Sequence, residues 1–242
     1  MPHVPGIGSA RDAIVARIGE AAARAGRDSA EVEIVAVTKT VPVERIRAAY
    51  AAGFRSFGEN RVQERATKQV EVDAAASYPA GQAPRWHLIG ALQSNKARRA
   101  IELFDVIETV DSLELAQRLD RIASEIRPDT RCSVLLQVNV DNDAAKSGFE
   151  PADLERALSE ILDLPALAVA GLMTVGRLVE VADEARPTFA ALRGLSERLR
   201  ARDERLGPAL SMGMSRDYVV AVEEGATLVR VGSAIFGARP TG

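Results

Sequence analysis

The sequence predicts an α/β fold, a single (β/α)8 TIM barrel that spans residues 1–242 as one domain. Eight short runs rich in β-branched and apolar residues alternate with longer helical patterns, as in a barrel of βα units. The runs at 32–38, 132–139 and 227–231 are apolar almost throughout, which is typical of parallel strands buried on both faces. A doubly wound open sheet is less favoured because it commonly uses fewer strands, and no Gly-x-Gly-x-x-Gly follows the first strand.

The expected elements follow in order. An extra N-terminal helix is predicted over 9–25, with Ser9 as its N-cap and Gly26 just after its end. The predicted strands are 32–38, 54–58, 86–89, 106–109, 132–139, 166–172, 209–212 and 227–231. The predicted helices between them are 43–52, 61–75, one from about 94, 112–126, 151–162, 180–204 and 216–224.

Composition and charge exclude several classes of protein. The net charge is -3 with 27% charged residues, so the clustered positive charge of a nucleic-acid-binding protein is missing. No apolar stretch reaches the ~20 residues of a membrane helix, and no signal pattern opens the chain. The single cysteine, Cys132, lies in an apolar run and is interpreted as a core residue. We therefore expect a cytoplasmic protein that binds neither nucleic acid nor a membrane.

Lys39 is the first candidate for chemistry, because it directly follows the apolar run at 32–38. In a barrel of this kind the functional groups lie at the carboxyl ends of the strands. Burial at such a place favours the neutral, nucleophilic amine, which is the form that attacks an aldehyde cofactor. The alternative for a strand-end lysine is a surface charge or an ion-pair partner.

Two segments resemble a phosphate site, which barrels commonly place after strands seven and eight. The first runs from Ser211 through Gly213 to Ser215, where a helix is expected to begin and offer free N–H groups to an anion. The second is Gly232-Ser233, directly after the last strand. Either segment alone could be a turn with a helix cap, but the presence of both favours phosphate.

Arg230 falls inside the last apolar strand, and an inward guanidinium needs a partner because it stays charged. A pyridine nitrogen is one candidate acceptor. A structural salt bridge with a strand-end carboxylate is the alternative.

Several segments together resemble the YggS/PROSC family of pyridoxal-phosphate-binding homeostasis proteins, whose fold is similar to the N-terminal barrel domain of alanine racemase. The matching segments are AVTKT (36–40), FGENRVQE (57–64), WHLIGALQSNK (86–96), QVNV (137–140), KSG (146–148), GLMT (171–174), LSMGMSRD (210–217) and VRVGSAIFG (229–237).

The resemblance implies that pyridoxal 5'-phosphate (PLP) is the cofactor, held as a Schiff base on Lys39. It also implies roles for other residues: Ser211, Ser215, Gly232 and Ser233 around the phosphate, Arg230 at the pyridine nitrogen, and Asn60 and Met173 along the ring, with His87 close by. His87 could instead be a satisfied core residue. Lys146 matches a loop lysine implicated in cofactor handling, or is a solvated charge. Ser233 departs from the threonine of many relatives but keeps a hydroxyl, and the chain has no lysine-rich C-terminal tail.

Three functions compete: a PLP-binding homeostasis protein that transfers PLP to apo-enzymes, a racemase-like PLP enzyme, and an unrelated barrel enzyme acting on a sugar phosphate. The third lacks an obvious acid/base pair, since only Glu59, Asp111 and Asp141 are near candidates. Racemisation needs a second acid/base group, which alanine racemases take from a β domain that this chain lacks; Tyr218 is the one tyrosine near the expected site. We therefore expect a monomeric PLP carrier without robust catalysis.

Overall fold

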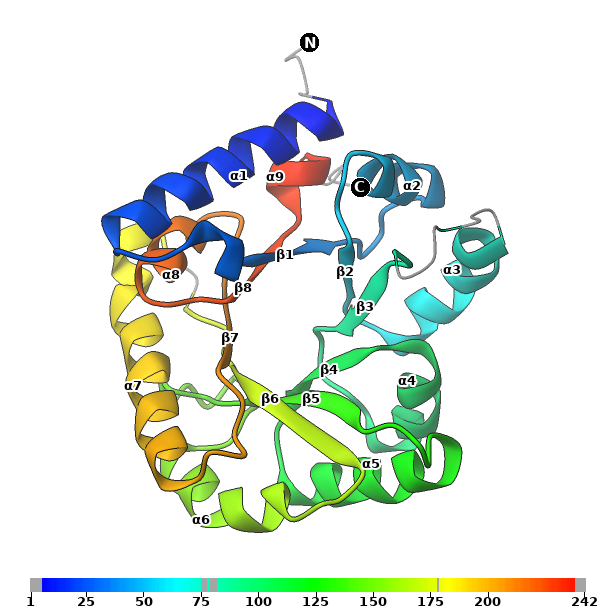
Figure 1. The fold of residues 1–242 in the computed structure, drawn as a ribbon, viewed down its shortest axis with the longest axis vertical. Helices are drawn as coiled ribbons and strands as arrows, with labels where there is room; N and C mark the ends of the chain where they lie inside the picture. Colours follow the sequence, from blue (N-terminus) through cyan, green and yellow to red (C-terminus); the bar gives the residue numbers. More distant parts are fainter. Residues whose placement is uncertain (1–5, 75–77, 79–81, 178, 238–242) are drawn as a thin grey trace.

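The strands form a closed parallel barrel in a computed structural model that describes residues 6–74, 78, 82–177 and 179–237. Each strand pairs with the next, and β8 pairs with β1 (Figure 1). The strands are β1 Glu33–Val37, β2 Ser56–Glu59, β3 Arg85–Leu88, β4 Val106–Val110, β5 Cys132–Gln137, β6 Leu167–Met173, β7 Ala209–Met214 and β8 Leu228–Val231. The predicted (β/α)8 barrel is confirmed.

The helices lie outside the ring of strands (Figure 1). They are α1 Ile7–Arg24, α2 Val43–Ala51, α3 Val62–Ala74, α4 Ala97–Leu103, α5 Leu113–Ile126, α6 Pro151–Leu162, α7 Arg186–Arg202, α8 Tyr218–Glu223 and α9 Ser233–Phe236, with 3-10 turns at Ser29–Glu31, Ser94–Lys96 and Ala182–Ala185. The extra helix α1 packs against α8 and α9. It begins at Ile7 with Gly6 as its N-cap, so the predicted cap at Ser9 is wrong.

Helix α5 shows how the pattern produces the outer layer. Ser112 caps the helix by accepting the Leu115 N–H at 3.2 Å. Leu115, Leu119 and Ala123 recur at four-residue spacing and are all buried. Full burial of one leucine side chain contributes about 2 kcal/mol, so this face holds the helix against the barrel.

Two predicted boundaries near the candidate site need correction. The helix expected from 216 begins only at Tyr218, and β7 continues to Met214. The pairing register between β7 and β8 shifts between Ser211 and Met214. Gly213 lies inside this irregularity with φ +88°, and a Cβ there would come within 2.4 Å of the Ala221 Cβ. Only glycine permits this conformation and this close approach of α8 to β7.

The barrel contains polar as well as apolar side chains. Ser56, His87, Glu108, Ser211 and Arg230 are all at most 4% exposed. Buried polar groups of this kind need hydrogen-bond partners, so their contacts indicate what the barrel is built to hold.

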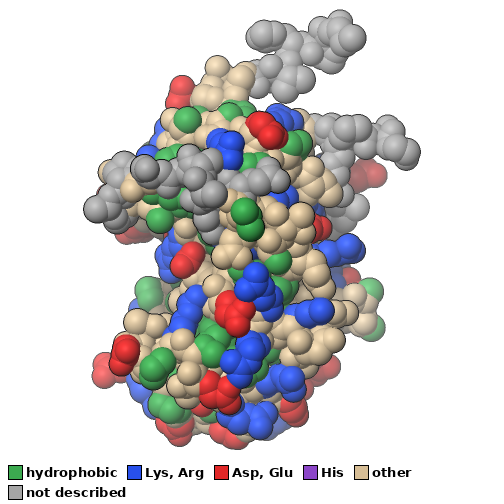
Figure 2. Space-filling model, turned by 90° about the vertical axis from the view of Figure 1, so that its right-hand side faces the viewer, with side chains coloured by type: hydrophobic (Ala, Val, Ile, Leu, Met, Phe, Trp, Pro, Cys, Tyr) green, Lys and Arg blue, Asp and Glu red, His purple; other side chains and the backbone are tan. Residues whose placement is uncertain are grey.

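The outer surface carries charges of both signs. Figure 2 shows Lys and Arg side chains interspersed with Asp and Glu over the face that lies on the right of Figure 1. Many surface charges of the described residues pair, as Arg99 does with Glu102 at 2.8 Å. Within the described residues, no helix combines the length and apolar character needed to cross a membrane.

Candidate functional site

Lys39 lies in a tight turn at the carboxyl end of β1. The turn is closed by the Val41 N–H, which donates to the Thr38 carbonyl at 2.9 Å. Thr40 has φ 62°, a left-handed conformation that costs a β-branched residue about 1–3 kcal/mol. Its hydroxyl donates to the Lys39 carbonyl at 2.6 Å. This strained turn presents Lys39, which is partly buried, at the mouth of the barrel.

A buried ion pair anchors the base of that turn. Lys68 donates to the Thr38 carbonyl at 2.8 Å and to Glu59 Oε1 at 2.7 Å. The Thr38 hydroxyl donates to the same Glu59 oxygen at 2.7 Å. Burial raises the pKa of Glu59 to about 7, although Lys68 and Thr38 oppose the shift. The carboxyl end of β1, which carries Lys39, is therefore fixed by the contacts of Thr38 with Lys68 and Glu59.

A cavity of about 510 Å³ opens at the carboxyl ends of β1, β7 and β8. Its lining comprises Val37, Lys39, Thr40, Val41, Pro42, Arg45, Arg177, Val179, Met214, Ser215, Arg216, Asp217, Arg230, Gly232, Ser233, Phe236 and Gly237. The set combines an amine, several cations and hydroxyls, and an apolar wall. It is the combination expected of a site for a small anionic ligand with an aromatic part.

Ser215 joins the two predicted phosphate segments. Its hydroxyl oxygen accepts the N–H groups of Gly232 at 3.0 Å and Ala234 at 3.4 Å. The residue is thus a link between the loops after β7 and β8, not the helix start that the sequence predicts. The N–H groups of Ser215, Arg216 and Ser233 donate to no other group in the described chain. These groups can therefore receive an anion at the cavity wall.

Arg230 points inward and is held at two points. One guanidinium nitrogen, Nη1, donates to the Ser211 hydroxyl at 2.5 Å, and Nη2 donates to the Thr174 carbonyl at 2.8 Å. A guanidinium has five N–H groups, so three remain for other partners at the cavity floor. Burial lowers the pKa of Arg230, while the charges of Glu108 and Asp217 oppose the shift.

Ser211 lies beneath the cavity, not in its lining. Its hydroxyl accepts from Arg230 and donates its single proton to Glu108 Oε2 at 2.6 Å. No proton is left for a phosphate oxygen. The predicted phosphate contact of Ser211 therefore gains no support.

A line of alternating charges continues from Arg230 into the barrel. Glu108 Oε1 lies 2.6 Å from His87 Nδ1, and His87 Nε2 lies 3.6 Å from Glu33 Oε1. Burial alone would lower the pKa of His87, but the hydrogen bond to Glu108 and the charges of Glu108 and Glu33 raise it to about 9. Burial likewise opposes the ionisation of Glu33, yet His87 and Ser56 lower its pKa to about 2. The pKa of Glu108 is also lowered against its burial, mainly by His87. His87 is thus an imidazolium between two carboxylates.

The cavity gathers most, but not all, of the predicted site residues. Lys39, Ser215, Arg230, Gly232 and Ser233 line it. The remaining candidates, Ser211, His87, Asn60 and Met173, do not.

The reasons differ for each of these. His87 is a fully buried interior residue whose Nδ1 is paired with Glu108, whereas its Nε2 has no hydrogen-bond partner among the described residues, so the alternative of a satisfied core residue holds for one ring nitrogen only. Met173 ends β6 with no exposed surface. Asn60 follows β2, where its backbone packs so closely that a Cβ on Gly90 would lie 2.3 Å from the Asn60 carbonyl oxygen. Ring contacts of Asn60 and Met173 stay predictions.

Several residues of the cavity and its surroundings were not predicted from the sequence. Arg45, Arg177, Arg216 and Asp217 line the cavity but were assigned no role, although Arg216 and Asp217 end the matching segment LSMGMSRD. Glu108 did carry a signal, because it interrupts the apolar run Val-Ile-Glu-Thr-Val just as Arg230 interrupts β8. Two opposite charges that lie inside two strands of one barrel indicate that the two residues pair with each other.

Other charged and phenolic candidates lie elsewhere. Lys146 contacts Asp141 at 3.3 Å and Asp143 at 3.7 Å, outside the cavity lining. Tyr218 is 2% exposed and packs under Arg17. The described residues that line the cavity include no tyrosine. Cys132 is buried with its pKa raised to about 11 by that burial, which confirms a core role.

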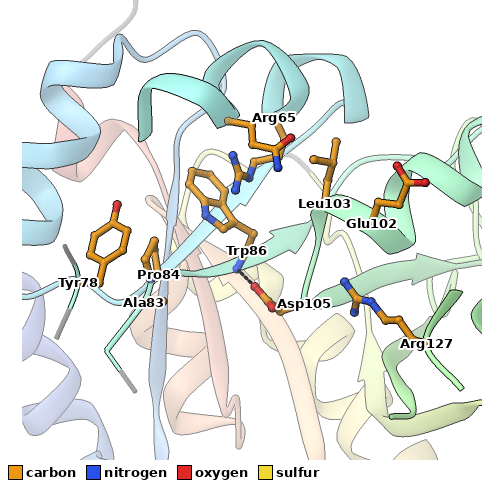
Figure 3. Close-up of a pocket in the computed structure, with 10 residues that line it drawn as sticks. Arg65, Tyr78, Ala83, Pro84, Trp86, Glu102, Leu103, Asp105 and Arg127 are labelled. Atoms are coloured by element: carbon orange, nitrogen blue, oxygen red, sulfur yellow. Dashed lines mark hydrogen bonds between the residues drawn. The ribbon is translucent and has the colours of Figure 1, made fainter. Parts of the chain in front are cut away.

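A second cavity, of about 310 Å³, lies near the amino ends of β3 and β4 (Figure 3). Arg65 stacks on the Trp86 ring at 4.3 Å, and the Trp86 backbone N–H donates to Asp105 at 2.7 Å. None of the predicted site residues is among the described residues that line this second cavity.

Comparison with known proteins places the chain in a family. The family of the alanine racemase N-terminal domain matches residues 10–240. The pyridoxal phosphate homeostasis protein of Pseudomonas aeruginosa is 45% identical over 232 residues, which is 95% of this chain and 94% of that protein.

Solved structures of similar proteins have the same fold. The structure of PipY from Synechococcus elongatus with PLP bound is 43% identical, with a TM-score of 0.79 over 91% of this chain and 100% of that one. An alanine racemase of Clostridium difficile shares the fold, with a TM-score of 0.69 at 16% identity over 94% of this chain and 60% of that one. The chain therefore belongs to the family of pyridoxal phosphate homeostasis proteins, which has the barrel fold of the alanine racemase N-terminal domain.

Proposed function

We propose that the chain binds PLP in the 510 Å³ cavity, as a Schiff base on Lys39, and transfers it to apo-enzymes. The observation that carries the proposal is one cavity lined by Lys39, by Arg230 and by the two serine-containing loops. The PLP-bound structure of the similar PipY supports it.

The donor set fits each part of this cofactor. The free N–H groups of Ser215, Arg216 and Ser233, with the Ser233 hydroxyl, would hold the phosphate. Arg230 would donate one of its three remaining N–H groups to the pyridine nitrogen and so keep that nitrogen unprotonated. The apolar wall, with Val37, Met214 and Phe236, would cover the ring.

PLP supplies an aldehyde carbon that an amine can attack reversibly. The turn around Thr40, anchored by Lys68, places Lys39 in the lining of the cavity. Arg177 has a side chain that is 64% exposed, and Arg216 is exposed, so the cavity rim meets solvent. A solvent-exposed rim suits release of the cofactor to another protein.

Binding on Lys39 is tested by the visible absorption of protein mixed with PLP. The wild type should gain a visible band, and Lys39→Ala should not. Lys96→Ala is the matched control, because Lys96 lies outside the cavity lining and should leave the band intact. A band that survives in Lys39→Ala would contradict the proposal.

Transfer is tested by mixing loaded protein with an apo-enzyme in the presence of a scavenger that destroys free PLP. Reactivation that resists the scavenger would support direct transfer. Reactivation that the scavenger abolishes would show that the apo-enzyme takes only released PLP.

A racemase-like activity is the second candidate, since alanine racemases share the fold. Two-base racemisation needs acid/base groups on both sides of the substrate carbon. Beside Lys39, the described lining offers Asp217, but its carboxylate already accepts the Met214 N–H at 2.6 Å. We expect loaded protein to leave the chirality of L- and D-amino acids unchanged; steady racemisation would favour the enzyme.

A further inference from the structure

Glu108 is fully buried in the middle of the barrel, and its two oxygens serve different partners. Oε1 contacts His87 Nδ1 at 2.6 Å, and Oε2 accepts the Ser211 proton at 2.6 Å. Arg230 Nη1 lies 3.9 Å from Oε2, so Ser211 forms the direct bridge between the carboxylate and the guanidinium.

The direction of each hydrogen bond in this bridge is fixed by chemistry. An arginine can only donate, so Ser211 must accept from Arg230. The hydroxyl then has one proton, which it gives to the ionised Glu108. A carboxylate at this position therefore sets the rotamer of Ser211, and Ser211 sets the position of Arg230 Nη1.

Glu108 also forms an ion pair with His87, in addition to its contact with Ser211. His87 on β3 faces Glu108 on β4 and Glu33 on β1, and these are the charged groups that face it among the described residues. The positive charge of the His87 imidazolium compensates the negative charge of the Glu108 carboxylate. Arg230 can then direct its remaining N–H groups to the cavity and not to the carboxylate.

We propose that Glu108 is a positioning residue that, through Ser211, holds the Arg230 guanidinium in place for the pyridine nitrogen of the cofactor. The inference rests on the proposed function, because it assumes that this nitrogen is the acceptor. Glu108 itself does not line the cavity.

The test compares the affinity for PLP with the affinity for its carbocyclic analogue, in which a C–H replaces the ring nitrogen. The wild type should prefer PLP, since the analogue cannot accept from Arg230. Glu108→Gln and Ser211→Ala should each weaken PLP binding about tenfold, the effect of one charge-assisted hydrogen bond, and should leave the analogue unchanged. Weakening of both ligands alike would show a structural role only and overturn the proposal.

A double variant adds a second criterion. If Glu108 acts through Ser211, then Glu108→Gln with Ser211→Ala should weaken PLP binding no further than either change alone. Additive losses would contradict the bridge. Glu33→Gln is the matched control, because it removes the other carboxylate of His87 and leaves the Glu108, Ser211 and Arg230 contacts in place. It should keep the preference for PLP.

The possible results distinguish failure of the proposed PLP binding from failure of the positioning role of Glu108. A wild type that binds neither ligand refutes the proposed function. A wild type that binds both equally refutes the ring-nitrogen contact. A wild type that prefers PLP, with a Glu108→Gln variant that keeps the preference, refutes only the positioning role. Without any ligand, Glu108→Gln should also lower the pKa of His87, and an unchanged His87 would contradict the network itself.

Discussion

His87 should remain protonated far above the usual pH range of a histidine. Its pKa rises from 6.5 to about 9 because the Glu108 and Glu33 carboxylates outweigh the cost of burial. At about 1.4 kcal/mol per unit, the network stabilises the folded protein by about 3 kcal/mol through this proton. The folded state holds the proton more tightly than the unfolded chain. The stabilisation is therefore complete below pH 6.5 and is lost as the pH rises through about 9.

Proton NMR can measure this directly, since the chain contains two histidines, His3 and His87. A His3→Gln variant assigns the two ring signals. The His87 signal should shift only near pH 9, and the free energy of unfolding should fall by about 1.4 kcal/mol per pH unit between 6.5 and 9 from this group. In His87→Gln that contribution to the slope should vanish. A His87 signal that titrates at 6.5 or below would refute the imidazolium.

Three further predictions concern the surroundings of the site. Lys68→Met leaves Glu59 buried without its cation and should cost about 3 kcal/mol in denaturant unfolding at pH 8. The loss should be smaller at pH 5, where Glu59 is protonated, and equal losses at both pH values would contradict the ion pair. Gly213→Ala should destabilise by at least about 2 kcal/mol because of its positive φ and the contact with Ala221, whereas Gly194→Ala inside α7 should be neutral or stabilising. Cys132 should resist a disulfide reagent at pH 8 in the folded protein and react once unfolded; rapid labelling of the native protein would contradict the burial of the thiol.

The barrel could be predicted because its signals are local and repeated. Runs such as 132–137 are mostly apolar and almost entirely buried, and each is followed by a helical pattern. The predicted helix over 151–162 matches α6 at both ends, where Pro151 occupies the first turn. The helix expected over 180–204 is instead a 3-10 turn at Ala182–Ala185 followed by α7, with Pro187 in the first turn of α7.

The site was harder to predict because its contacts cross the barrel. Lys39 and Arg230 could be found, since each carries a charge at or within an apolar strand. The hydrogen-bond partner of Ser211 could not be predicted, because the hydroxyl could face the cavity or the barrel interior. Only the position of Glu108 decides between these two orientations. His87 shows the same limit, since its two carboxylate partners lie 54 residues away on β1 and 21 residues away on β4.

We propose that the Lys39 amine holds PLP in the cavity at the carboxyl ends of β1, β7 and β8. Borohydride reduction of the protein with PLP, followed by peptide mass spectrometry, tests it most directly. One phosphopyridoxyl adduct, on Lys39, is expected at stoichiometric PLP. An adduct mainly on Lys68, Lys96 or Lys146, or none at all, would contradict it.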